Sequence, residues 1–260
     1  MMKLEEIKSK LDGLSPVKVS FIARVIEALS NPPALNVRSV GTWLTANPEW
    51  TEYFGLALSV HHGATTEPLR LTAFETVFRN ACEHMDWNVL PPESQTQRFI
   101  DMTVSPRPGM TLHLSLKSTA ARNLSKTSLH ISKLTEASWI QDIRKASQRR
   151  FETINLFRAY RQAVSHIIML RAFRDKQEAP PYLYQLVEVP VSIFDSIEDA
   201  PVEAFASDGP RVPCMVDGKQ VATVALDRSD AKITVSGISL SACIIHAEWQ
   251  KQEESQRPGK

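Results

Sequence analysis

Cysteine is scarce in this 260-residue chain: Cys82, Cys214 and Cys243 are an odd number of thiols without metal-ligand spacing. Long apolar runs are lacking too, and no stretch approaches the roughly 20 residues that a membrane span needs. The start, MMKLEEIKSKLDG, is charged and has no apolar stretch of the secretory kind. These absences exclude a zinc module and a membrane span, and we expect a cytoplasmic globular protein.

Excess charge is also lacking, since the net charge is only +1. The aromatic residues, 7% of the chain, do not interleave with basic ones as they do in single-strand or RNA binders. The charges are nevertheless segregated. Between positions 98 and 133 a single acid, Asp101, stands among six basic residues: Arg98, Arg107, Lys117, Arg122, Lys126 and Lys133. Such a local excess attracts phosphates and favours duplex DNA as the partner, although a solvated charged face would show the same composition.

Hydrophobic periodicity predicts an α/β (α+β) chain with one domain over 1–250 and a disordered tail over 251–260. Apolar residues at helical spacing predict helices over 18–30 and 68–85, and one long helix or two abutting ones over 138–174. Alternating patterns predict strands over 99–105, 110–118 and 182–190 and three more in the tail, VATVAL, KITVSGISL and CIIHAEW. Turns are expected at 106–109, at Asp217-Gly218 and at Ser229-Asp230.

The first two strands form a predicted hairpin whose polar face carries chemistry. Asp101 alternates with the apolar residues of the first strand, and Ser115 and Lys117 lie two apart on the second, so we expect all three on one non-core face. Hydrolysis of a phosphodiester needs a divalent cation, carboxylates to hold it and a group that activates water. Asp101 and Lys117 fit two of those roles. An incidental ion pair on a surface hairpin is the alternative.

This arrangement is that of the PD-(D/E)xK nuclease motif, with two departures. The chain has Ile100-Asp101 for PD, and Ser115-Leu116-Lys117 for (D/E)xK. Because a serine is no substitute for a carboxylate as a magnesium ligand, a second acid must come from elsewhere. Glu75, on the helix before the hairpin, is the candidate, and Asp86 and Glu93 are weaker ones because they follow that helix.

Several segments resemble the SmaI-like type II restriction endonucleases. They are FGLALSVHHGATTEPLRLTAFETVFRNA (54–81), IDMT (100–103), LSLKSTAARNLSKTSLHISKL (114–134), YQLVEVP (184–190) and CIIHAEW (243–249). The resemblance implies a PD-(D/E)xK fold with a mixed β-sheet flanked by helices. It also implies a homodimer that cuts a short DNA palindrome with Mg²⁺, leaving 5′-phosphates, with CCCGGG and blunt ends as the first target to test. A cognate DNA methyltransferase would protect the host DNA.

The resemblance assigns roles to the candidate residues. Asp101 and Glu75 would ligate the metal, together with the carbonyl of Leu116. Lys117 would orient or activate the attacking water and stabilise the pentacovalent phosphate, while Ser115 and Ser118 would donate supporting hydrogen bonds. The residues that follow the catalytic strand are expected at the DNA, on phosphates or on base edges: Ser118, Arg122, Asn123, Lys126, His130 and Lys133.

Other polar residues have an open role. His61 and His62, if on a strand, face opposite ways and cannot share one metal ion, and His246 in an apolar strand is typical of a satisfied core histidine. Arg144, Lys145, Arg149 and Arg150 could follow the DNA backbone or form a solvated helix face. Two alternative functions stay open: a catalytically inactive DNA-binding relative, suggested by Ser115, and a PD-(D/E)xK nuclease of DNA repair.

Overall fold

The computed structural model describes residues 4–91, 98–121, 123–176 and 179–252. The predicted tail lies outside these residues from position 253 onward. Within the described ranges the main helices are α1 (Leu4–Asp12), α2 (Pro16–Ser30), α3 (Pro48–Ala64), α4 (Leu71–His84) and α5 (Ala146–Ala163). Short 3₁₀ helices cover Ser138–Ile140, Val191–Asp199, Val202–Phe205 and Leu240–Ala242. No helix of the described ranges is both long and apolar enough to cross a membrane.

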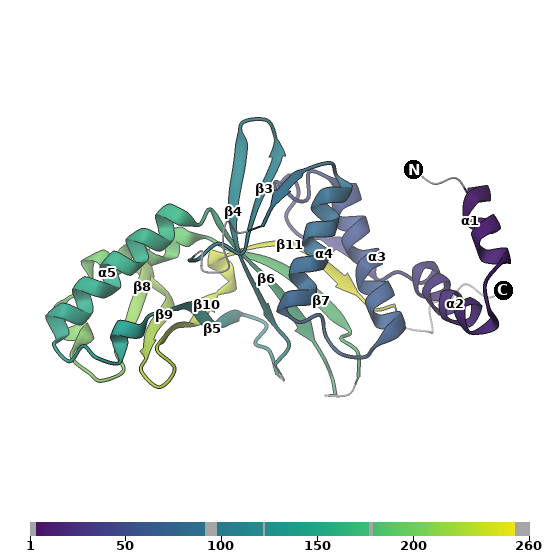
Figure 1. Cartoon of the computed structure of the whole chain (residues 1–260). Helices are drawn as coiled ribbons and strands as arrows, with labels where there is room; N and C mark the ends of the chain where they lie inside the picture. Colours follow the sequence, from purple (N-terminus) through teal and green to yellow (C-terminus); the bar gives the residue numbers. More distant parts are fainter. Residues whose placement is uncertain (1–3, 92–97, 122, 177–178, 253–260) are drawn as a thin grey trace.

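A seven-stranded mixed sheet forms the centre of the molecule (Figure 1). Its strand order is β1-β11-β7-β6-β4-β3-β2, and only the β4–β6 pair is parallel. The strands are β1 (Ala34–Val37), β2 (Asn88–Leu90), β3 (Met102–Arg107), β4 (Met110–Thr119), β6 (His166–Phe173), β7 (Leu183–Val189) and β11 (Ile244–Gln250). Helices α3 and α4 lie against one face, which confirms the expected mixed sheet flanked by helices.

A second, antiparallel sheet was not expected. Its four strands run in the order β5-β10-β9-β8, with β5 (Ser128–Glu136), β8 (Arg211–Val216), β9 (Lys219–Asp227) and β10 (Lys232–Ser239). Together with α5 it lies on the side of the central sheet opposite α3 and α4 (Figure 1). The turns at Asp217-Gly218 and Ser229-Asp230 join its strands, as the sequence predicts, and Asp217 and Gly218 both have positive φ.

The central sheet is therefore buried on both faces. Leu114, Leu116 and Ile168 pack against α3 and α4, whereas Ile167 and Met169 pack against α5 and the second sheet. The predicted polar face of the hairpin is thus no open surface, because Ser115 on that face is only 1% exposed. The expectation that this was a non-core face was wrong at Ser115.

Three local predictions were also wrong. The helix expected over 138–174 ends at Ala163, and 166–173 is strand β6, an interior strand whose residues are buried on both sides of the sheet. His61 and His62 lie in α3 rather than on a strand. The hairpin turn is shorter than 106–109, since β3 extends to Arg107 and β4 begins at Met110.

Candidate active site

Asp101 lies directly before β3, at the point where the hairpin register sets it beside Ser115 and Leu116. Its own N–H donates to the carbonyl of Leu114 (2.8 Å), and Met102 pairs with Leu114 in the register that follows. One carboxylate oxygen, Oδ2, accepts the backbone N–H of Leu116 at 2.7 Å and lies 3.4 Å from Ser115 Oγ. The backbone of β4 thereby fixes the carboxylate before any ligand arrives.

Lys117 completes this cluster. Its Nζ donates to Asp101 Oδ2 at 3.2 Å and to the Leu116 carbonyl at 3.1 Å, and its side chain is 15% exposed. The ammonium thus contacts both the Asp101 carboxylate and the Leu116 carbonyl, the two groups that the resemblance implies as metal ligands. Both oxygens therefore already interact with the positive charge of Lys117, as the ligand oxygens of a cation site interact with the bound ion.

Glu75, on α4, is electrostatically coupled to the same cluster. Burial raises the pKa of its carboxyl, the negative charge of Asp101 raises it further, and Lys117 and Arg79 oppose the shift. A carboxyl whose charge is disfavoured by a neighbouring carboxylate gains from a divalent cation between the two. Glu75 thus interacts by charge with Asp101, and its role as a metal ligand stays a prediction.

The oxygen donors fit magnesium in kind. Asp101, Glu75 and the Leu116 carbonyl supply hard oxygen ligands, and Mg²⁺ usually keeps several waters and contacts only one or two carboxylates. Among the described residues no group of three or more His, Cys, Asp and Glu side chains is arranged to hold a metal. Water and the DNA phosphate would therefore have to complete the coordination. Of the weaker alternatives, Asp86 is exposed beyond the end of α4, and Glu93 lies outside the described residues.

Tyr160 was not foreseen from the sequence. It lies on α5, is fully buried, and its ring packs edge-on against Phe99 at 5.1 Å. Burial raises the pKa of the phenol, and the negative charge of Asp101 raises it further, whereas Ser115 opposes the shift. The phenol therefore lies near Asp101 and Ser115. It makes no hydrogen bond of normal geometry within the described ranges. In the sequence Tyr160 is one of the apolar residues at helical spacing, and this periodicity gives no sign that its hydroxyl has a polar role.

The residues predicted at the DNA occupy the connection after β4 and the strand that follows. Asn123 and Lys126 are exposed between β4 and β5, His130 and Lys133 are exposed on β5, and Ser118 adjoins Lys117 on β4. Arg122 lies outside the described residues. Lys133 pairs with Glu136 at 2.6 Å on the surface. Their contact with DNA stays a prediction.

The basic cluster at the start of α5 does not form one solvated face. Arg149 is 3% exposed and donates to the carbonyls of Phe205 (3.2 Å), Ala206 (3.4 Å) and Ser207. Arg150 donates to the carbonyls of Ala200 and Glu198. These two guanidinium groups donate to backbone carbonyls of the protein and are therefore not available to contact the DNA backbone.

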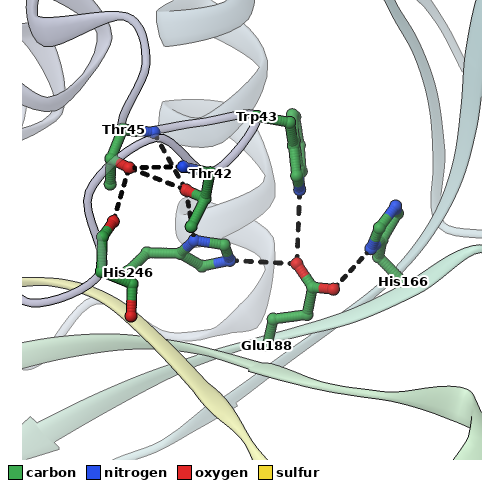
Figure 2. A network of polar contacts seen from close by, with 7 residues as sticks. Thr42, Trp43, Thr45, His166, Glu188 and His246 are labelled. Carbon is green, nitrogen blue, oxygen red and sulfur yellow. Dashed lines mark hydrogen bonds and ion pairs between the residues drawn. The ribbon is translucent and has the colours of Figure 1, made fainter.

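His246 is the satisfied core histidine that its strand suggested. Figure 2 shows it with Glu188, His166, Trp43 and Thr42 in one polar network, in which His246 and Glu188 are buried. Its Nε2 lies 3.1 Å from Glu188 Oε2, and its Nδ1 lies 2.9 Å from Thr42 Oγ1. The other oxygen of Glu188 lies 2.7 Å from His166 Nδ1, and Trp43 Nε1 donates to Oε2 at 3.3 Å. The network joins β6, β7 and β11 to the segment before α3.

His61 and His62 serve the fold rather than a metal. His62 Nε2 lies 2.9 Å from the Tyr184 hydroxyl and its Nδ1 lies 3.1 Å from the Thr65 carbonyl, while His61 Nε2 lies 2.9 Å from the Glu67 carbonyl. Burial lowers the pKa of His62 to about 4, so its imidazole is neutral near pH 7. These hydrogen bonds fix the connection between α3 and α4, and therefore the start of the helix that carries Glu75.

Comparison with known proteins supports the resemblance found in the sequence. The type II restriction enzyme SmaI of Serratia marcescens is 25% identical over 213 residues, which cover 78% of this chain and 80% of that protein. The chain is SmaI-like. No protein-family model and no solved structure matches it. The alignment covers most of both chains, so the SmaI-like resemblance is not confined to the short motif around Asp101.

Proposed function

We propose that this SmaI-like restriction enzyme makes Mg²⁺-dependent double-strand cuts at a short palindromic DNA site. The observation that carries the proposal is the cluster in which Asp101 accepts the Leu116 N–H and Lys117 bridges Asp101 and the Leu116 carbonyl. Glu75, coupled to Asp101 by charge, supplies the second acid that Ser115 cannot provide.

The residues divide the work of phosphodiester hydrolysis. Asp101 and Glu75 would hold Mg²⁺ with the Leu116 carbonyl, and the bound cation would neutralise the charge that develops on the phosphate. Lys117 orients the attacking water and stabilises the pentacovalent phosphate with its ammonium. Water adds to phosphorus as the P–O3′ bond breaks, which leaves a 5′-phosphate and a 3′-hydroxyl. Ser115 and Ser118 support these groups by hydrogen bonds.

A palindrome presents the same sequence to two copies of the chain, so the proposal includes a homodimer with one active site for each strand. The first target to test is CCCGGG with blunt cutting, which follows from similarity to SmaI. We also propose a cytoplasmic enzyme whose host DNA is protected by a cognate methyltransferase, a functional rather than a physical partner.

Digestion of phage DNA by the purified protein, with and without Mg²⁺, tests this proposal. We expect discrete fragments whose sequenced ends share one palindrome, and no cutting without the metal. Intact DNA from several sequence-rich substrates would contradict it. That outcome combined with tight, site-specific binding would favour the inactive DNA-binding relative, for which the buried Ser115 in the usual position of an acid is the supporting observation.

Glu75→Gln is expected to raise the Mg²⁺ concentration for half-maximal cleavage at least about tenfold, because a carboxylate ligand is lost. Since burial and Asp101 raise the pKa of Glu75, protonation competes with the metal, and the Mg²⁺ requirement of the unchanged protein should rise as the pH falls. The variant should lose part of that dependence. Magnesium titrations of the cleavage rate at several pH values measure both effects.

The matched control is Glu83→Gln, an exposed acid on the same helix. Its Mg²⁺ requirement should equal that of the unchanged protein. If both variants needed the same Mg²⁺ concentration for half-maximal cleavage, Glu75 would not be a metal ligand.

A further inference from the structure

The 123–128 turn, between β4 and β5, has its backbone carbonyls directed into the protein. Arg171 on β6 donates through one terminal nitrogen to the carbonyl of Ser125, and to that of Ser128 at 3.3 Å. The carbonyl of Thr127 accepts the Leu240 N–H at 2.9 Å. Just before the turn, Arg174 donates to the Ala120 carbonyl at 3.2 Å. Two arginines therefore hold this connection, Arg171 on β6 and Arg174 directly after the end of that strand.

Arg171 is an unusual group to bury. It is 1% exposed, and its hydrogen bonds go to the oxygens of uncharged groups. Its other contacts are Gln185 Oε1, at 2.6 Å, and the ring of Phe173, whose centroid is 4.8 Å from the guanidinium carbon. Burial lowers the pKa of Arg171, while Cys243 and Glu248 oppose the shift. A buried cation is costly unless it is hydrogen-bonded. Here two carbonyls of the turn and Gln185 accept from the terminal nitrogens, while Nε has no hydrogen-bond partner within the described ranges.

The turn is also ordered from within. Ser125 Oγ accepts the N–H groups of Thr127 (3.2 Å) and Ser128 (3.1 Å) and lies 3.0 Å from Ser128 Oγ. With its carbonyls held inward and this hydroxyl fixing the bend, the turn leaves the side chains of Asn123 and Lys126 exposed. Asn123 adopts a positive φ of 55°, a conformation that asparagine tolerates better than most residues.

The turn is close in register to the active site. On the parallel β4–β6 pair, Lys117 is opposite Met169 and Thr119 is opposite Arg171. Because side chains two residues apart on a strand share a face, Arg171 and Lys117 point to the same side of the sheet. One strand pair thus carries the catalytic lysine and, two residues further along, the anchor of the exposed turn.

We propose that Arg171 is a positioning residue that fixes the 123–128 turn so that Asn123 and Lys126 meet the DNA in one conformation. It sets DNA affinity and discrimination between sites, and it does not act in the chemical step. This inference rests on the proposed function, since it needs DNA as the substrate. Charge alone is not sufficient for this role, because one planar guanidinium contacts two carbonyls and Gln185 at fixed angles.

Arg171→Met and the milder Arg171→Lys test the proposal, with Arg149→Met and Arg149→Lys as matched controls. Arg149 is also a buried arginine that holds backbone carbonyls, but these belong to Ile143, Phe205, Ala206 and Ser207, and it also pairs with Asp208 at 3.0 Å. We expect both Arg171 variants to raise the KM for DNA by about tenfold to hundredfold with kcat nearly unchanged, and to cut sites with one altered base pair relatively better. The Arg149 variants should keep the KM and the discrimination.

Hydrogen exchange of the DNA-free proteins separates the inference from the proposed function. The amides of Thr127 and Ser128 should exchange at least about tenfold faster in Arg171→Lys than in Arg149→Lys. If the unchanged protein cuts no DNA, the proposed function fails whatever the exchange shows. If it cuts DNA, and the Arg171 variants match the Arg149 variants in KM, discrimination and exchange, the positioning role is overturned. A fall in kcat with unchanged KM would overturn it as well.

Discussion

Replacing Asp101 by asparagine is expected to slow DNA cleavage on the order of 10³-fold, since several kcal/mol of charge stabilisation is lost and each 1.4 kcal/mol or so is worth tenfold in rate. Asparagine has nearly the same size and keeps an oxygen for the Leu116 N–H, so the hairpin should fold unchanged. What disappears is the negative charge that holds Lys117 and would hold the metal. Lys117→Met should cause a loss of similar size. Single-turnover rates at saturating Mg²⁺ measure both.

The second sheet offers a matched control for this pair. Lys232 Nζ lies 2.6 Å from Asp230 Oδ2 at the turn between β9 and β10, an Asp–Lys pair on a hairpin with no expected role in catalysis. Asp230→Asn and Lys232→Met should cut DNA at the rate of the unchanged protein. Undiminished cutting by the Asp101 and Lys117 variants as well would make the first pair incidental and place the active site elsewhere.

Glu188→Ala is expected to lower the free energy of unfolding by about 3–5 kcal/mol, the usual cost of removing one partner from a buried ionic network. The Glu188 side chain is 9% exposed and satisfies His166, His246 and Trp43 at once (Figure 2). The variant leaves the buried His246 and the partly buried His166 and Trp43 without this partner. Urea unfolding curves give the change. Glu136→Ala is the control, because its pair with Lys133 is exposed to solvent and should contribute little to stability.

The same network predicts how stability depends on pH. Burial by itself would raise the pKa of Glu188, but the hydrogen bonds and charges of His166 and His246 lower it to about 2, from 4.5. A carboxyl whose folded pKa is lowered stabilises the fold above its unfolded pKa, and this stabilisation is lost as the pH falls from 4.5 to about 2. Glu188→Gln should flatten that part of the stability curve. An equally steep acid loss in the variant would mean that other groups cause it.

The sequence was most informative where a local pattern determines the structure. Alternation around Asp101 and Lys117 predicted the hairpin and its facing side chains, because strand geometry fixes them at short range. The pattern over 166–173 misled, since a strand buried on both faces has no period to distinguish it from a buried helix. The segments that resemble SmaI-like proteins did not predict this strand either.

Contacts between residues far apart in the chain could not be foreseen. Tyr160 on α5 lies near Ser115 and Asp101, Arg171 contacts the Ser125 carbonyl, and Glu188 joins His166 to His246 across three strands. Each depends on the strand order of the central sheet, which single-sequence periodicity does not contain. Such residues look like ordinary members of a helix or strand until the fold brings their partners together.

A crystal structure of the protein with duplex DNA and Ca²⁺, an oxygen-binding divalent cation used in place of Mg²⁺, tests the central claim most directly. We predict one cation in contact with the carboxylates of Asp101 and Glu75, the carbonyl of Leu116 and the scissile phosphate, with Lys117 Nζ moved from Asp101 towards the phosphate. A cation without Asp101 among its ligands, or DNA bound on a face away from the β3–β4 hairpin, would contradict the account.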